Sequence, residues 1–148
     1  MQTEVKIKKV RKNAVIPSYA TPGSAALDLR SALEESITIA AHSRAAVPTG
    51  IAVAVKDSSV VSVVCARSGL ATKHGIALAN GIGVIDSDYR GEILVSLINT
   101  SDTDFTIEPG DRIAQLMFMP VLTAKLSECK ELDETERGAG GFGSTGIK

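Results

Sequence analysis

The sequence predicts a single all-β domain, arranged as a sandwich or a barrel. Apolar residues recur at every second position in several segments, as half-buried strands require. Turn-forming segments separate these strands at close intervals, and one short stretch alone has the pattern of a helix. The chain has 148 residues, which is about the length of one domain, so we expect one core.

The predicted strands begin near the N-terminus and continue through the middle of the chain. Residues 5–9, 37–39 and 51–55 carry large apolar residues at alternate positions, which indicates half-buried strands. Residues 60–66 and 92–99 are rich in β-branched residues and too short for a globular helix, so we expect both to be central strands. Aromatic residues make up only 3% of the chain, so the core must consist mainly of Val, Ile, Leu and Ala.

The remaining local signals are one helix and a series of turns. Residues 68–75, SGLATKHG, are the helix candidate, which we expect Ser68 to open as the N-cap residue and Gly75 to close. Segments rich in Pro, Gly, Ser, Asn, Thr and Asp predict turns at 21–24, 48–50, 56–59, 99–104 and 108–111.

The C-terminal end differs from the rest of the chain. Five of the 13 glycines lie between Gly138 and Gly146, after a charged segment, and nothing there could bury one face of a strand. We therefore expect a β domain at residues 1–136 and a mobile Gly-rich arm at 137–148.

Composition and charge exclude several classes of protein. A net charge of −1 excludes a basic coat for nucleic acid, and no stretch approaches the roughly 18 to 20 apolar residues of a membrane helix. The first ten residues lack the apolar region of a secretory signal, so we expect a soluble, cytoplasmic protein. Cys65 and Cys129 form neither a zinc spacing nor a disulfide framework, and no His and Cys cluster predicts a metal cage.

The segment from Gly83 to Glu92, GVIDSDYRGE, is the first candidate for chemistry. It lies between two apolar strands and implies a hairpin. If Ile85 points into the core, alternation places Asp86 on the opposite face, where a carboxylate could act as a general base on a water. The alternative is an ordinary turn, because Asp, Ser and Gly are common turn residues.

A second candidate, residues 66–71 (ARSGLA), lies where a strand meets the predicted helix start. Arg67, together with backbone N–H groups exposed at that start, could bind an anion such as a phosphate. The alternative is that Ser68 only caps the helix and Arg67 is solvated.

The third candidate is the arm segment 137–146, RGAGGFGSTG. Its glycine backbone could wrap a polyphosphate while Phe142 stacks on a flat ring, and the alternative is a disordered tail. It is not a P-loop, because it lacks the Gly-Lys-Ser/Thr ending and a preceding strand.

Two further polar residues stand in apolar surroundings. Gln115, within 110–118, could donate to a ligand oxygen, although a strand also exposes polar positions to water without any function. Asp28 lies between two leucines, where it could position a neighbouring Arg or a water, or be structural.

Five of these segments, taken in order, resemble the five motifs of the trimeric deoxyuridine triphosphatases (dUTP diphosphatases, dUTPases). They are 25–32 (AALDLRSA), 66–71, 83–92, 110–116 (GDRIAQL) and 137–146. The resemblance implies a jelly-roll-like β barrel that forms a homotrimer, with each active site built from all three subunits. The reaction it implies is hydrolysis of dUTP to dUMP and diphosphate, which limits uracil incorporation into DNA and supplies dUMP for dTMP synthesis.

The resemblance also implies roles for individual residues. Asp86 would activate the water, Asp28 would support it, and Mg²⁺ would be held by the substrate phosphates and waters rather than by protein ligands. Phosphate contacts would come from Arg67, Ser68, Gly69, Gln115, Arg137, Gly143, Ser144 and Thr145. Uracil and deoxyribose contacts would come from Asn80, Gly81, Ile82, Gly83, Tyr89 and Phe142.

Some positions depart from the family pattern, and two other functions stay open. Ala26 and Leu27 stand where many members have Gly-Tyr, and Ala66 stands where Pro is usual, which bears on local backbone shape. The deoxycytidine triphosphate deaminases share the fold but need a glutamate base and lack the full arm. A catalytically silent β trimer that binds nucleotide or a partner protein is the other alternative.

Overall fold

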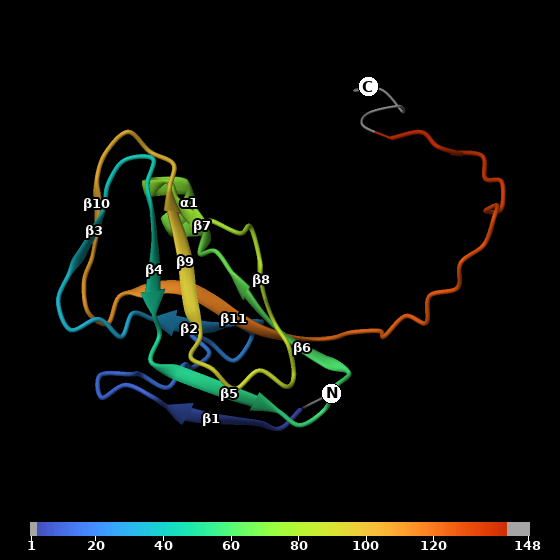
Figure 1. Cartoon of the computed structure of the whole chain (residues 1–148). Coiled ribbons are helices and arrows are strands. Elements are labelled where there is room, and N and C mark those ends of the chain that lie inside the picture. Colours follow the sequence, from blue (N-terminus) through green and yellow to red (C-terminus); the bar gives the residue numbers. More distant parts are fainter. Residues whose placement is uncertain (1–2, 142–148) are drawn as a thin grey trace.

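The computed structural model describes residues 3–141, which contain eleven strands and one helix (Figure 1). The elements are β1 (Val5–Lys9), β2 (Leu27–Arg30), β3 (Ile37–Ile39), β4 (Arg44–Pro48), β5 (Ile51–Val55), β6 (Val60–Cys65), α1 (Ser68–His74), β7 (Ile76–Leu78), β8 (Gly83–Ile85), β9 (Leu94–Asn99), β10 (Phe105–Ile107) and β11 (Arg112–Pro120). Within this part of the chain, no helix is long and apolar enough to cross a membrane.

The strands form four antiparallel sheets, and the all-β prediction is confirmed. The larger sheets have the strand orders β2-β11-β6-β8 and β4-β9-β7, and the smaller ones are the pairs β1-β5 and β10-β3. The two larger sheets cross steeply in Figure 1 and enclose the core between them. The described residues form separate sheets rather than one closed barrel, an arrangement that is consistent with a jelly-roll-like fold.

The segments predicted as central strands occupy central positions. β6 lies between β11 and β8, and β9 lies between β4 and β7. The buried apolar residues are all Val, Ile, Leu or Ala, as the low aromatic content predicts. The most buried include Val47, Ile51 and Leu97, each at most 1% exposed.

The predicted hairpin is only partly correct, and the difference creates the candidate site. β7 and β9 do pair, with Ile76 opposite Asn99 and Leu78 opposite Leu97. The short strand β8 between them pairs instead with β6, in the other large sheet. The chain therefore crosses between the sheets twice within residues 79–93, and this crossing loop spans the opening between them.

The helix α1 starts one residue earlier than the N-cap prediction implies. Arg67, with an extended backbone, is the N-cap residue, and Ser68 is the first helical residue, so the prediction for Ser68 is wrong. Arg67 has no side-chain capping bond. Gly75 closes the helix as predicted, with a φ of 67° in the left-handed region that glycine adopts without strain.

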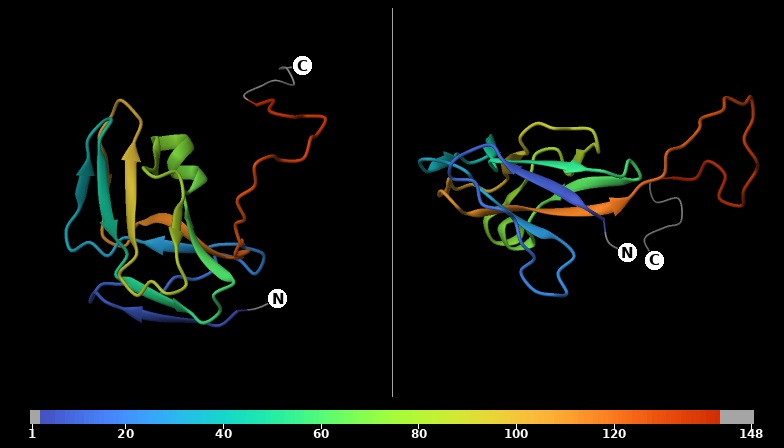
Figure 2. Two further views of the ribbon diagram at one scale, coloured as in Figure 1. Left: turned by 45° about the vertical axis from the view of Figure 1, so that its right-hand side comes forward. Right: turned by 90° about the horizontal axis from the view of Figure 1, so that it is seen from below.

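After Val121, whose N–H donates to the Ser59 carbonyl at 2.8 Å, residues 122–141 leave the body of the molecule and run through solvent (Figures 1 and 2). Leu122, Leu126 and Leu132 are almost fully exposed there. The predicted division into residues 1–136 and 137–148 stays a prediction.

Candidate active site

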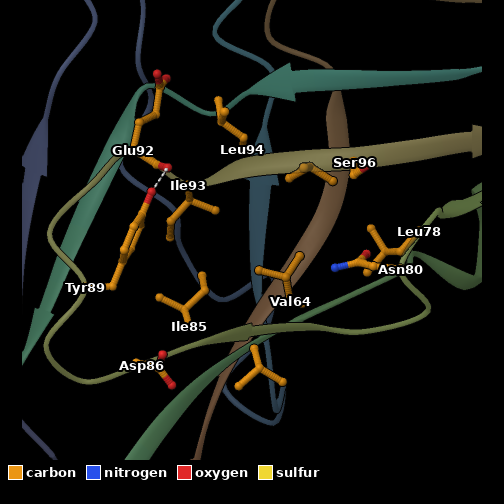
Figure 3. Close-up of a pocket in the computed structure, with 13 residues that line it drawn as sticks. Val64, Leu78, Asn80, Ile85, Asp86, Tyr89, Glu92, Ile93, Leu94 and Ser96 are labelled. Atoms are coloured by element: carbon orange, nitrogen blue, oxygen red, sulfur yellow. Dashed lines mark hydrogen bonds between the residues drawn. The ribbon is translucent and has the colours of Figure 1, made fainter.

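A cavity of about 260 Å³ lies between the two larger sheets, beside the crossing loop (Figure 3). Strand residues of both sheets form its apolar side, and residues of the crossing loop supply most of its polar groups. Pockets for drug-sized ligands occupy roughly 300–1,000 Å³, so this cavity suits a nucleoside-sized group better than a whole nucleoside triphosphate. Its lining includes Val64, Asn80, Gly83, Ile85, Asp86, Tyr89 and Glu92.

Asp86 lines this cavity from the position directly after β8. Ile85 is partly buried against the core and Asp86 is exposed, as the alternation predicts, and both residues border the cavity. The Tyr89 N–H donates to the Asp86 carbonyl at 3.2 Å, which closes the turn. Among residues 3–141 the Asp86 carboxylate enters no ion pair, so it is available to a ligand or a water.

Tyr89 forms a wall of the same cavity, although its residue is 47% exposed. Its hydroxyl donates to the Glu92 carbonyl at 3.1 Å, the bond drawn in Figure 3. Gly91 lies against the ring: a Cβ there would lie 2.5 Å from Tyr89 Cζ, which is closer than real Cβ contacts allow. The ring is therefore packed on the backbone of its own loop.

Residues 80–83 form the turn between β7 and β8. The Ile82 N–H donates to the Asn80 carbonyl at 2.8 Å, and Gly81 has a φ of 71°, which favours glycine. The Asn80 side chain and Gly83 line the cavity, whereas Gly81 and Ile82 are exposed and lie outside its lining. The structure thus brings Asn80 to the same cavity as Asp86 and Tyr89 (Figure 3), and Gly83 lines that cavity too.

A second group of predicted residues gathers around Asp28, whose side chain is 14% exposed. Arg67 Nε lies 3.4 Å from Asp28 Oδ1, and Arg112 Nη1 donates to Asp28 Oδ2 at 3.1 Å. Arg67 also donates to the Arg112 carbonyl at 3.0 Å, and Gln115 lies opposite Asp28 in the sheet. Two guanidinium groups share one carboxylate, so the group keeps a net positive charge that suits an anion. Ser68 and Gly69 follow Arg67 and are exposed.

These two groups lie on opposite faces of one sheet. Gln115 is opposite Asp28, whereas the next residue, Leu116, is opposite Val64, which lines the cavity. Successive strand residues point to opposite faces, so Asp28 and Gln115 face away from the cavity side. A single chain therefore carries both groups of predicted site residues without bringing them together.

Comparison with protein families matches residues 12–146 to the family described as dUTPase. The chain belongs to the dUTPase family. Its relatives include the deoxyuridine 5′-triphosphate nucleotidohydrolase of Desulfitobacterium hafniense, 51% identical over 146 residues, with 97% of each chain covered. The protein of the same description from Shewanella oneidensis is 46% identical over 152 residues, with 100% of each chain covered.

Solved structures of dUTPases share the fold of this chain. A dUTPase of Staphylococcus bacteriophage 80alpha, in complex with dUpNHpp, has a TM-score of 0.89 and 26% identity, with 99% of this chain and 100% of that chain covered. A dUTPase from phage phi11 of S. aureus, described with a structural Mg(II) ion, has a TM-score of 0.79 and 21% identity, with 88% of this chain and 99% of that chain covered. The likeness to the phi11 protein concerns the fold.

Half of the fifth dUTPase motif, residues 142–146, lies outside the described residues. Arg137 is exposed in the segment that leaves the body, and its Nε donates to the Gly140 carbonyl at 2.9 Å. The remaining predicted arm residues, Phe142, Gly143, Ser144 and Thr145, lie outside residues 3–141.

The carboxylates of this chain bear on the metal expected for a dUTPase. Across residues 3–141, no group of three or more His, Cys, Asp or Glu side chains could hold a metal ion. Asp28 is engaged by two arginines, and Glu92, which also lines the cavity, is paired with Arg11. This leaves Asp86 as the cavity carboxylate without an ion pair among residues 3–141. Mg²⁺ commonly binds through substrate phosphates, waters and one or two carboxylates, so this donor set fits a metal ion carried by the phosphates.

Sequence reasoning missed two residues that support the dUTPase cavity. Glu92 lines it, and its carboxylate accepts from Arg11 Nε at 2.6 Å and Arg11 Nη2 at 2.9 Å. Arg11 lies 81 residues away in the sequence. The only sequence signal was the position of Glu92 at the end of the segment that contains Asp86.

Proposed function

We propose that this chain hydrolyses dUTP to dUMP and diphosphate. The main observation behind this proposal is that the Asp86 carboxylate lines a nucleoside-sized cavity and enters no ion pair among the described residues. The chain that carries it belongs to the dUTPase family. Its relatives are described as deoxyuridine 5′-triphosphate nucleotidohydrolases, and the phage 80alpha dUTPase binds the analogue dUpNHpp. The activity would limit uracil incorporation into DNA and supply dUMP for dTMP synthesis.

In this proposal Asp86 acts as the general base of the reaction. Its carboxylate accepts a proton from a water whose oxygen attacks the α-phosphorus. The new bond joins the water oxygen to that phosphorus, and the bond from the phosphorus to the oxygen bridging the α- and β-phosphates breaks. Diphosphate leaves with the bridging oxygen, and dUMP keeps the α-phosphate.

The cavity would bind the uracil and the deoxyribose. Asn80 and the backbone at Gly81, Ile82 and Gly83 would pair with the polar edge of uracil, because a mismatched base would leave buried polar groups without partners. Tyr89, which borders the cavity beside Asp86, would pack against the deoxyribose and leave no room for a 2′-hydroxyl.

The phosphates would bind the cluster around Asp28, through Arg67, Ser68, Gly69 and Gln115. Because this cluster and the cavity lie on opposite faces of one sheet, the cluster that serves a cavity would belong to another copy of the chain. We propose a homotrimer, in which the arm of a third copy, with Arg137, Phe142, Gly143, Ser144 and Thr145, closes over the β- and γ-phosphates and the uracil ring. Closure of such an arm excludes bulk water.

A metal ion and a compartment complete the proposal. Mg²⁺ bound to the phosphates would neutralise part of their charge. Asp86 would act on the water beside it, and Asp28 would support the site through the arginines that it binds. We propose the cytoplasm as the compartment, because Cys65 and Cys129 are free thiols, as a reducing compartment maintains.

The test is release of diphosphate from dUTP in the presence of Mg²⁺, with dCTP in a parallel reaction. The proposal predicts diphosphate from dUTP and no reaction with dCTP. Release of ammonia from dCTP would instead indicate the deaminase alternative. Binding of dUTP without any product would indicate the silent trimer.

A further inference from the structure

Glu92 connects the cavity to a part of the chain that does not touch it. Its side chain is 19% exposed, and its carboxylate accepts three N–H groups: two from Arg11 and the Gly50 backbone N–H at 2.8 Å. The two Arg11 bonds reach different carboxylate oxygens, which is the paired geometry that fixes a carboxylate most firmly.

The anchor of this carboxylate is itself rigid. The Val10 N–H donates to the Gly50 carbonyl at 2.8 Å, so the chain that carries Arg11 is bonded to Gly50 independently of Glu92. A Cβ on Gly50 would lie 2.6 Å from Ala14 Cβ, which shows how closely the two segments pack. Arg11 therefore holds Glu92 from a fixed position at the ends of β1 and β5.

The backbone of Glu92 in turn holds the Tyr89 side chain. Its backbone carbonyl accepts the Tyr89 hydroxyl, and the ring rests on Gly91, the residue before it. The loop is fixed at Ile93, whose N–H donates to the Ile51 carbonyl at 2.9 Å and whose carbonyl accepts the Thr49 N–H at 3.2 Å. Residues 86–92 form no strand, and their backbone and side-chain hydrogen bonds stay within the loop except at the Glu92 carboxylate. The carboxylate contacts of Glu92 are side-chain contacts that tie this loop to the rest of the domain.

We propose that Arg11 is a positioning residue for sugar selectivity, which acts through Glu92 to keep the Tyr89 ring at the wall of the cavity. The inference rests on the proposed function, in which Tyr89 excludes a 2′-hydroxyl. Arg11 is not part of the cavity lining, so it touches neither substrate nor water there. Its loss should loosen the wall and leave the Asp86 chemistry intact.

The first test compares dUTP with UTP, which carries the 2′-hydroxyl. In Arg11→Met, we expect the ratio of kcat/KM for dUTP over UTP to fall about tenfold, while kcat for dUTP changes less than about twofold. Arg11→Lys keeps the positive charge and one of the two contacts with the Glu92 carboxylate, so it should keep part of the selectivity for dUTP over UTP. Lys12→Met, which removes the neighbouring exposed cation, should keep the wild-type ratio.

An unchanged ratio in Arg11→Met, with a lowered melting temperature, would show that the ion pair only stabilises the fold. If Arg11→Met does not fold, Arg11→Gln, which loses the paired contact with the Glu92 carboxylate, decides the question, because a wild-type ratio in that variant contradicts the proposal.

The second test needs no substrate. The chain has no Trp and two Tyr, so Tyr19→Phe leaves Tyr89 as the single tyrosine fluorophore. In that background, Arg11→Met should increase quenching of Tyr89 by acrylamide, and Lys12→Met should not. Unchanged quenching would overturn the proposal. A failure of the proposed function would appear separately, as wild-type protein that releases no diphosphate from dUTP.

Discussion

The cavity and the cluster around Asp28 differ in what one chain supplies. The cavity is complete within the chain, because the crossing loop brings Asn80, Asp86 and Tyr89 to one place. The cluster is also well formed, since Asp28 orients Arg67 and Arg112, but it faces the other side of the sheet. In the homotrimer that we propose, the cavity and the cluster are two half-sites of each chain, and assembly of copies would join them.

The largest expected effect is on the cavity. Asp86→Asn should lower kcat for dUTP by roughly 10²–10⁴-fold, because the general base is lost, while binding of dUpNHpp persists. Rapid-quench turnover and calorimetry measure the two quantities. Asp88→Asn, an exposed neighbour outside the cavity lining, is the control and should keep activity. Near-wild-type turnover in Asp86→Asn would reject its role.

Deletion of the arm should have the second-largest effect. The arm belongs to neither half-site, so its loss tests closure alone. Deletion of residues 137–148 should lower kcat/KM about 10²-fold, because closure around the phosphates is lost. The urea midpoint should stay at the wild-type value, because residues 137–141 lie in the segment that runs away from the body and all but Gly140 are exposed. Deletion of residues 147–148 alone serves as the control. Normal hydrolysis by the longer deletion would contradict a closing role.

A substitution in the cluster around Asp28 should weaken binding of the phosphates and leave binding of the nucleoside unchanged. Arg67→Met should raise the KM for dUTP roughly tenfold or more, because a charge-assisted contact is lost, and leave the affinity for deoxyuridine unchanged. Steady-state kinetics and calorimetry with deoxyuridine measure both effects. Arg44→Met, an exposed cation on β4, should change neither. A matching loss of deoxyuridine binding would mean that the two half-sites are not separate.

The smallest effect concerns acid stability near the cavity. The hydrogen bond from Arg11 lowers the pKa of Glu92 below its ordinary 4.5, although partial burial opposes this. A lowered folded-state pKa stabilises the fold above the ordinary value, and that contribution disappears as the pH falls through the lowered pKa.

The urea midpoints of wild type and Glu92→Gln should therefore differ by a constant amount above about pH 5.5 and converge as the pH falls through the lowered pKa of Glu92. Glu35→Gln, an exposed carboxylate, should show no such convergence. A difference between wild type and Glu92→Gln that is independent of pH would show that the Glu92 charge has no part in it.

Local patterns in the sequence predicted much of the fold. The period of two predicted β1, β3 and β5, and the β-branched runs predicted the central positions of β6 and β9. These features depend on side chains that alternate along one strand. Gly75 was predicted correctly because a positive φ at a helix end favours glycine.

The features that were missed depend on contacts between distant parts of the chain. The pairing of β8 with β6 instead of β9 placed Asp86 and Ile85 on one cavity. The Arg11 and Glu92 pair joins residues 81 positions apart, which no local period reveals. The two half-sites lie on opposite faces of the sheet because of the register of β11 with β2 and β6. The sequence pattern alone does not predict this register.

Mixed oligomers test the sharing of sites most directly. At dUTP concentrations well below the wild-type KM, Asp86→Asn chains are expected to be nearly inactive and Arg67→Met chains to keep about a tenth of the wild-type activity or less. The two variants can be unfolded together in equal amounts and refolded. If the cavity and the cluster of one site come from different copies, random mixing should restore about a quarter of the wild-type sites. Activity that stays at the level of the single variants, with mixing of differently tagged chains confirmed, would contradict a site shared between copies.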